Sequence, residues 1–145
     1  MHFFLLLLLS CSTVFTQDGP AAGRPNLRQR AESGDPDAQF LLAKNYESGR
    51  TGLKKDYTQA AYWYRIPAEK GDPFAQASLG LLYRFGKGVA LDLPEAYFWL
   101  GLATARTTGA DSESLAEYRD AVAAKLTQEQ IVSAKKRIVA RTPKL

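Results

Sequence analysis

The chain has 145 residues, of which 46% are hydrophobic and 23% charged, with a net charge of +4, as expected for one compact globular domain. The only Cys is Cys11 and the only His is His2, so the chain after its N-terminal segment lacks the side chains for thiolate or imidazole metal sites. The same absence excludes Cys–His and Ser–His–Asp catalysis there.

Residues 1–16 have the pattern of an export signal. The apolar run Phe3–Leu9 is shorter than the about 20 residues that a membrane-spanning helix needs, and small polar residues follow it. The tetrapeptide Leu8–Cys11, L-L-S-C, resembles the lipobox of bacterial lipoproteins, which implies a lipid on Cys11. Ordinary cleavage near Ser12 or Thr16 is the alternative, and an uncleaved anchor is a third. No Lys or Arg precedes the apolar run, in contrast to the usual signal peptide, which a mis-assigned translation start would explain. We expect an exported protein that is periplasmic, anchored to a membrane through Cys11, or secreted.

Residues 17–26 contain two Gly and two Pro and are predicted to form a flexible linker. The stretch from Asn26 to Glu32 is long enough for one short helix, the remnant of a preceding structural unit. The predicted repeat domain covers residues 27–105.

This domain contains the same segment twice. Residues 31–39, A-E-S-G-D-P-D-A-Q, and residues 68–76, A-E-K-G-D-P-F-A-Q, agree at seven of nine positions. Further identical pairs follow in both copies: Leu42 and Leu79, Tyr46 and Tyr83, Gly49 and Gly86, Asp56 and Asp92, Ala60 and Ala96, Trp63 and Trp99. The duplication predicts two units of one repeat, about 31–67 and 68–103.

Each unit has the parts of a helical hairpin. Asp35 and Asp72 are suited to cap a first helix, with Pro36 and Pro73 at its first position, where no amide hydrogen is needed. Gly49 and Gly86 are expected to end that helix, and a second helix begins after Asp56 or Asp92. Apolar residues at helical spacing give each helix one buried stripe. We expect the aromatic residues of these stripes to be core, namely Tyr46, Trp63, Tyr83 and Trp99. Pro67 is predicted to kink the second helix or end it near Ile66.

Residues 106–145 are predicted to form a capping helix pair that closes the stack. The first helix is expected over Ser112–Lys125, with Asp111 as its cap and an apolar line of Leu115, Tyr118, Val122 and Leu126. Thr127 opens the second helix with a capping-box pattern, and its apolar face is Ile131, Ala134, Ile138 and Val139. The acidic residues Asp111, Glu113, Glu117 and Asp120 are read as helix-start and surface charges and not as a metal or acid–base site. The basic residues of this region lack a recognition motif, so we expect no binding of nucleic acid.

The second copy reads A-E-K-G-D-P-F-A-Q-A-S-L-G-L-L-Y-R-F-G-K-G-V over residues 68–89, and Asp92, Ala96 and Trp99 continue it. This pattern resembles the Sel-1-like repeat, a relative of the tetratricopeptide repeat. The first copy departs from it at Ala43, where the pattern has Gly. The resemblance implies an all-α fold, an α-solenoid of two Sel-1-like helix-turn-helix repeats with C-terminal capping helices, which displays a surface for partner proteins.

By analogy with tetratricopeptide repeats, a partner would meet side chains of the first helices outside the packing pattern: Phe40, Lys44, Glu47, Phe74, Leu81 and Arg84. Packing on neighbouring helices is the alternative for Phe40, Phe74 and Leu81. The resemblance thus favours a non-enzymatic protein–protein interaction module, an adaptor or scaffold in the bacterial cell envelope, without cofactor or metal. The alternatives are a structural subunit of an envelope complex, or a cell-wall or β-lactam hydrolase. Only distant relatives suggest the hydrolase, and this chain lacks their Cys pairs.

Overall fold

The structure is a computed structural model that describes residues 26–142. Regular secondary structure in that stretch is entirely α-helical, which confirms the predicted all-α class. The predicted export signal, the lipidation of Cys11 and the predicted linker before Asn26 lie outside the described residues. The helices are α1 (Leu27–Glu32), α2 (Pro36–Ser48), α3 (Tyr57–Glu69), α4 (Pro73–Phe85), α5 (Leu93–Arg106), α6 (Gly109–Ala123) and α7 (Gln128–Arg141).

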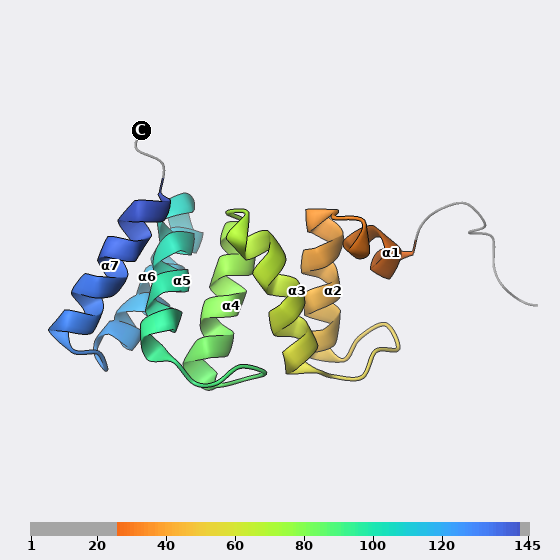
Figure 1. Cartoon of the computed structure of the whole chain (residues 1–145), viewed down its shortest axis with the longest axis horizontal. Helices are drawn as coiled ribbons and strands as arrows, with labels where there is room; N and C mark the ends of the chain where they lie inside the picture. Colours follow the sequence, from red (N-terminus) through yellow and green to blue (C-terminus); the bar gives the residue numbers. More distant parts are fainter. Residues whose placement is uncertain (1–25, 143–145) are drawn as a thin grey trace, which may run out of the picture.

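Helices α1 to α5 form a row in which each helix packs against the next one in the chain (Figure 1). Within each unit the first helix, α2 or α4, packs against the second helix, α3 or α5. Helix α4 also packs against α3 of the preceding unit, so the two units share one continuous core. This arrangement is the predicted α-solenoid of two helix-turn-helix repeats.

The helices of the two units begin at the predicted positions because a carboxylate accepts the first free amide hydrogens of each one. The carboxylates of Asp35 and Asp72 accept from the third helical amides of α2 and α4 at 3.2 and 2.7 Å. Asp56 and Asp92 do the same for α3 and α5 at 3.0 and 2.9 Å. Pro36 and Pro73 stand at the start of α2 and α4. The sequence therefore sets four of the helix starts by local chemistry alone.

A buried glutamine ties each first helix to the helix before it. The side-chain amide of Gln39 donates to the carbonyl oxygen of Ala31 at 3.0 Å, and that of Gln76 donates to Ala68, also at 3.0 Å. Both glutamines are almost fully buried, with 3% and 2% of their surface exposed. The Ala and Gln of the repeated A-E-x-G-D-P-x-A-Q segment are thus two ends of one inter-helix hydrogen bond.

A second repeated contact uses the tyrosines that the sequence assigned to the core. A guanidinium nitrogen of Arg28 donates to the hydroxyl of Tyr46 at 3.2 Å, and one of Arg65 donates to Tyr83 at 2.6 Å. Tyr46 is buried, whereas Tyr83 is half-buried and packs on the edge of the core. Each ring therefore fills space in the core while its hydroxyl joins two helices.

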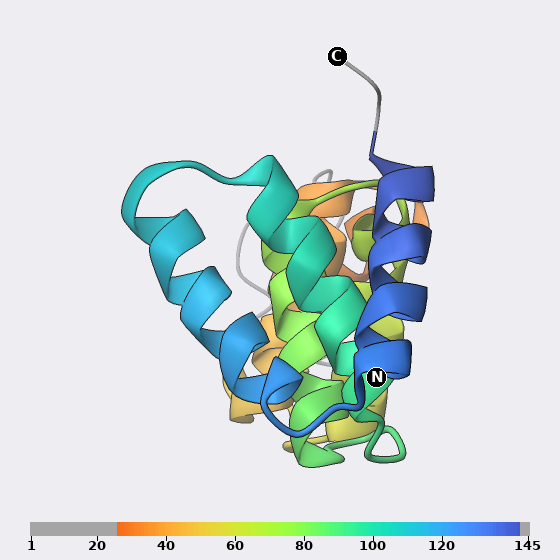
Figure 2. The same ribbon diagram turned by 90° about the vertical axis from the view of Figure 1, so that its left-hand side faces the viewer.

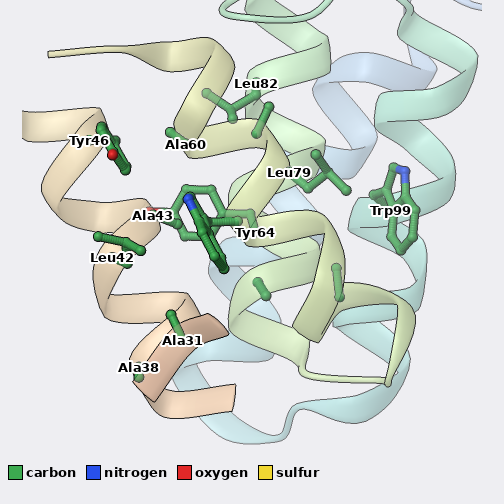
Figure 3. Close-up of a cluster of buried hydrophobic side chains, with 14 of the residues drawn as sticks. Ala31, Ala38, Leu42, Ala43, Tyr46, Ala60, Tyr64, Leu79, Leu82 and Trp99 are labelled. Atoms are coloured by element: carbon green, nitrogen blue, oxygen red, sulfur yellow. The ribbon is translucent and has the colours of Figure 1, made fainter. Parts of the chain in front are cut away.

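The core alternates alanines with large side chains, as the helical stripes predicted. Ala60 and Ala96 have no exposed surface, and Trp63 and Trp99 are only 6% and 2% exposed. Small residues let neighbouring helix axes approach closely, and the rings then fill the remaining space. Figure 3 shows this alternation around Tyr64, a 1% exposed residue of α3. The prediction that Trp63 and Trp99 pack in the core is confirmed.

Pro67 does not end its helix. Helix α3 continues through Pro67 to Glu69, so the prediction of a helix end near Ile66 is wrong. The reason is position: only the final turn follows Pro67, and other hydrogen bonds hold that turn. The carbonyl of Pro67 accepts from the amide of Asp72 at 3.0 Å, and that of Ala68 accepts from Gly71 at 3.1 Å. The missing amide hydrogen of Pro67 thus costs one hydrogen bond without disrupting the helix end.

Helices α6 and α7 both cover α5, and each packs against it from its own side (Figure 2). Helix α6 begins at Gly109, three residues earlier than predicted, so Asp111 lies in its first turn and is not its cap. Thr127 forms the predicted capping box at the start of α7: its amide donates to the side-chain oxygen of Gln130 at 2.9 Å, and its hydroxyl accepts from the amide of Gln130 at 3.2 Å. Two residues of the predicted apolar faces are exposed instead, Tyr118 by 45% and Val139 by 66%.

Candidate protein-binding surface

The six residues predicted to meet a partner fall on two equivalent lines, one along α2 and one along α4. The 37-residue offset between the repeats (Ala31 to Ala68) pairs Lys44 with Leu81 and Glu47 with Arg84. Because residues three and four apart share one side of a helix, each set forms one stripe. We call the surface made by Phe40, Lys44, Glu47, Phe74, Leu81 and Arg84 the first-helix face.

On α2 the stripe is organised around Tyr64 of α3. The rings of Phe40 and Tyr64 lie 5.5 Å apart in a tilted arrangement, and the ammonium of Lys44 lies 5.8 Å from the centre of the Phe40 ring. The buried hydroxyl of Tyr64 donates to a carboxylate oxygen of Glu47 at 2.7 Å. Phe40 and Glu47 are half-buried and Lys44 is exposed. The structure therefore brings the three predicted residues of α2 into one connected cluster.

Burial raises the pKa of Tyr64 above its ordinary value, and the hydrogen bond and negative charge of Glu47 raise it further. The phenol thus stays protonated and keeps donating its hydrogen bond across the physiological range. This bond fixes the Glu47 carboxylate at the rim of the core, so an acidic group is held in place beside the exposed Lys44.

On α4 the three predicted residues do not form one cluster. Phe74 lies in the first turn, 52% exposed, while Arg84 lies in the last turn, about 15 Å further along the helix axis at 1.5 Å per residue. Leu81, between them, is half-buried and packs against the core formed by α5, α6 and α7. Arg84 also contacts another helix, because its guanidinium lies near an aromatic ring of α6 as well as one of α4.

Arg84 is one end of a series of cation–aromatic contacts that the sequence did not predict. Its guanidinium carbon lies 5.7 Å from the ring of Tyr118 and 5.0 Å from that of Phe85. The ammonium of Lys87 then lies 5.5 Å from Phe85 and 5.2 Å from Tyr57, and that of Lys55 lies 5.1 Å from Tyr57. We call this series the cation–aromatic ladder, which consists of Lys55, Tyr57, Lys87, Phe85, Arg84 and Tyr118.

The ladder is a positively charged, partly apolar surface. Within residues 26–142 none of its three cations takes part in an ion pair. A hydrogen bond from Lys55, with the charges of Lys55 and Lys87, lowers the pKa of the Tyr57 phenol, which reports a positive local potential. Phe85 and Tyr118 are 54% and 45% exposed, so their rings offer apolar surface beside the charges. This combination suits carboxylates and apolar side chains of a partner.

Two features explain why the sequence missed the ladder. Tyr118 lies three and four positions from Leu115 and Val122, so its spacing assigns it to the buried stripe of α6. Tyr57, Arg84 and Tyr118 lie on three different helices, and only the tertiary packing of the chain brings them together. Exposed aromatic residues at helix ends, such as Phe85 beside Gly86, were the one available signal.

Across residues 26–142 no group of three or more His, Cys, Asp or Glu side chains is placed to hold a metal ion. None of the helices described combines the length and the apolar character needed to cross a bilayer.

Comparison with known proteins places the repeats in a family. The pattern of the Sel1 repeat matches residues 36–72 and 73–106. The crystal structure of c5321, titled a protective antigen of uropathogenic Escherichia coli strains with an SLR fold, is similar with a TM-score of 0.66 and 36% identity over 75% of this chain. A Sel1 repeat protein from Oxalobacter formigenes is similar with a TM-score of 0.57 and 33% identity over 63% of the chain. Among curated proteins, HRD3A of Arabidopsis thaliana, a component of an ERAD-associated E3 ubiquitin-protein ligase, is 34% identical over 62 residues, 43% of this chain.

These relatives are longer proteins. The similar part is 22% of the E. coli chain, 26% of the Oxalobacter chain and 9% of the Arabidopsis protein. The similarity therefore extends over the repeats and the fold, and leaves the rest of each relative without a counterpart here.

Proposed function

Since this chain carries two repeats of the Sel1 family, we propose that it is a non-enzymatic protein-binding module that holds an acidic, partly apolar segment of a partner protein. The observation that carries this proposal is the cation–aromatic ladder, which adjoins the first-helix face at Arg84. Solenoids of stacked helix pairs use extended surfaces of this kind to bind other chains. The ubiquitin-ligase component among the relatives is itself part of a protein assembly by its name.

The ladder specifies the chemistry of the partner. Its three cations, which form no ion pair with the residues that the structure describes, attract carboxylates, and Phe85 and Tyr118 offer exposed apolar surface between them. Aromatic residues and Arg are also the side chains that most often dominate the binding energy of protein interfaces. On α2, Lys44 and the fixed carboxylate of Glu47 provide a second, mixed-charge contact for the same segment.

Selection from a random peptide library on the purified chain tests this function. We expect enrichment of peptides that combine Asp or Glu with aromatic or aliphatic residues, with affinity that falls as salt rises. Lys87→Glu should weaken the selected peptides at least ten-fold, whereas Lys135→Glu, a charge change of equal size on an exposed lysine of α7, should not. Enrichment without acidic residues, or equal loss in both variants, would contradict the proposal.

A hydrolytic role has little to support it in the described residues. Residues 26–142 contain no His or Cys. Ser133 and Lys136 have the spacing of an S-x-x-K motif, but both are exposed on α7, where water screens the lysine from the serine. Turnover of nitrocefin by the purified chain, lost in Ser133→Ala, would overturn the non-enzymatic assignment.

We also propose that the module works in the cell envelope, attached through a lipid on Cys11. The apolar run followed by L-L-S-C supports this location, and one similar structure is titled a protective antigen. The intact mass of the protein from a membrane fraction provides the test. A mature chain that begins at Cys11 and carries acyl groups is expected, and an unmodified chain that begins after Cys11 would exclude the lipid.

A further inference from the structure

The two repeats differ in how the preceding helix covers them. In the second repeat, α4 packs against α3, which is 13 residues long. In the first repeat, α2 packs against α1, which has only six residues. The 37-residue offset aligns Leu27–Glu32 with residues 64–69, so the first two turns of α3, residues 57–63, have no helical counterpart among the residues the structure describes.

In the second repeat these two turns sit directly on the loop that follows α4. A Cβ added to Gly88 would lie 2.1 Å from the carbonyl oxygen of Tyr57, so the loop and the first turn of α3 touch through their backbones. Gly88 also has a φ of +68°, which disfavours any side chain. Below this contact Leu79 and Leu82 of α4 are buried, 0% and 2% exposed. The second repeat thus shows what this surface is shaped to hold.

The first repeat keeps the same surface without the helix. Gly52, the counterpart of Gly88, has a similar φ of +78°, but a Cβ added there would have no atom of residues 26–142 within 4 Å. Beside it opens a mainly apolar crevice of about 350 Å³, lined by Leu27 of α1, by Leu42, Asn45 and Tyr46 of α2 and by Leu53. Leu42 is the counterpart of Leu79, and Tyr46 is that of Tyr83. We call this crevice the N-terminal seat.

One residue of the seat differs in a way that points to a ligand. Asn45 occupies the position of Leu82 and is only 6% exposed. Its side-chain amide makes no hydrogen bond within residues 26–142 and is not one of the fully buried unpaired groups there, so it is open to the crevice. This amide adds to a lining that also includes the polar residues Asn26, Arg28 and Thr51, and it is suited to meet a backbone group of whatever enters.

The chain directly before α1 is poorly suited to supply the missing turns. Pro25 precedes the cap residue Asn26, and residues 18–25, D-G-P-A-A-G-R-P, hold two Gly and two Pro and no aromatic side chain. This sequence does not share the pattern of residues 57–63, which have an aromatic residue followed by two Ala three and four positions later. A helix for the seat is more readily provided by another molecule.

We propose that the N-terminal seat receives the first two turns of an α-helix from a partner protein, a helix that resembles residues 57–63 of this chain. Such a helix carries an aromatic residue in its first turn, like Tyr57, and small residues three and four positions later, like Ala60 and Ala61. The backbone of its first turn would lie against Gly52 as that of Tyr57 lies against Gly88, and the small residues let the following turn pack closely. The partner would thereby extend the solenoid by the part of a unit that is missing. This contact is separate from the first-helix face and does not depend on it.

A peptide with the sequence of residues 54–63, K-K-D-Y-T-Q-A-A-Y-W, is the probe for this proposal. Its binding to the full chain is followed by the amide NMR shifts of Leu42, Tyr46 and Gly52. A helix this short is unstable in isolation, so we expect a dissociation constant between about 10 μM and 1 mM. A probe with Tyr57→Ala should bind at least ten-fold more weakly.

Gly52→Ala and Gly34→Ala form a matched pair of protein variants. Both glycines have positive φ, +78° and +97°, and an added Cβ meets no atom within 4 Å at either, so both variants carry comparable backbone strain and should fold. Only Gly52→Ala puts a methyl group where the incoming helix must lie. We expect it to weaken the probe at least ten-fold while Gly34→Ala binds like the parent.

Several results would overturn the proposal. The first is the absence of shifts at millimolar probe, and the second is equal binding by the Gly52→Ala variant. Tighter probe binding after removal of residues 1–25 would assign the seat to the chain's own N-terminal segment. A self-association that Gly52→Ala abolishes in sedimentation would assign it to a second copy. Arg84→Glu should leave probe binding unchanged, which separates this test from that of the proposed function.

Discussion

The buried amide of Gln76 gives the clearest quantitative prediction. In Gln76→Ala the hydrogen bond to the Ala68 carbonyl is lost, which costs about 1 kcal/mol net. The carbonyl is not left unpaired, because it still accepts from the amide of Gly71 at 3.1 Å. Removal of a 2% exposed side chain between α3 and α4 adds a cavity cost of about 1–2 kcal/mol. Loss of the buried Gln76 Oε1, which has no partner among the described residues, offsets part of this. We expect a net loss of about 2 kcal/mol.

Urea unfolding followed by circular dichroism measures this loss. With a slope of about 1.5 kcal/mol per molar urea, the midpoint should fall by roughly 1–1.5 M. Gln39→Ala is the matched control, because Gln39 makes the same 3.0 Å bond to Ala31. Gln39 holds only the six-residue α1 against α2, and α1 is too short to be stable alone. Loss of the Gln39 bond should therefore appear as faster hydrogen exchange in α1, with little change in the urea midpoint. Equal midpoint shifts in the two variants, or a Gln76→Ala shift below about 0.3 M, would refute the reasoning.

Three further outcomes are expected. Arg137 pairs with Glu95 at 2.9 Å, and its guanidinium lies 4.0 Å from the centre of the Phe98 ring. Arg137→Ala should therefore weaken the packing of α7 by about 1 kcal/mol, which hydrogen exchange detects as faster exchange in α7. Unchanged exchange would show that the apolar contacts of α7 hold it in place without Arg137. Arg30 lowers the pKa of the Asp35 carboxyl below its ordinary value, so ionised Asp35 stabilises the fold above its unfolded pKa, and this stabilisation is lost as the pH falls through the folded pKa. Arg30→Gln should raise the pKa of Asp35 in an NMR titration, and an unchanged pKa would contradict the role of this pair. Because the pKa of Tyr64 is raised in the fold, its protonated form stabilises the fold below about pH 10, and this stabilisation is lost as the pH rises further. Tyr64→Phe should therefore be less stable than the parent at neutral pH by about 1 kcal/mol but should lose less stability in alkaline unfolding. An equal alkaline loss of stability in the two proteins would contradict the bond to Glu47.

Much of the fold could be predicted because it is encoded locally and twice. The Asp–Pro starts of α2 and α4, the ends at Gly49 and Gly86 and the capping box at Thr127 each depend on side chains within a few residues of one another. The buried stripes follow from 3.6-residue periodicity, and duplication of the segment turned a weak pattern into a specific one. Where only one copy existed, the prediction weakened: the start of α6 and the faces of Tyr118 and Val139 were wrong.

The candidate surfaces depended on packing that periodicity does not reveal. The stripe of α2 was predicted as exposed residues, but the bond from Tyr64 to Glu47 exists only because α3 lies against α2. The cation–aromatic ladder brings residues from Lys55 to Tyr118 together through the stacking of α3, α4 and α6.

The sequence by itself determined that this protein is a pair of helical hairpins of one repeated kind, because caps, breaks and apolar stripes act over three or four residues. Only the tertiary structure decided which of the repeated positions are covered by another helix. Gly52 and Gly88 occupy equivalent places and have similar backbone angles, yet Gly88 lies against the backbone of Tyr57, whereas no atom of the described part of the chain lies within 4 Å of a Cβ at Gly52. A residue's identity cannot specify that difference, because it depends on whether a helix from elsewhere reaches the site.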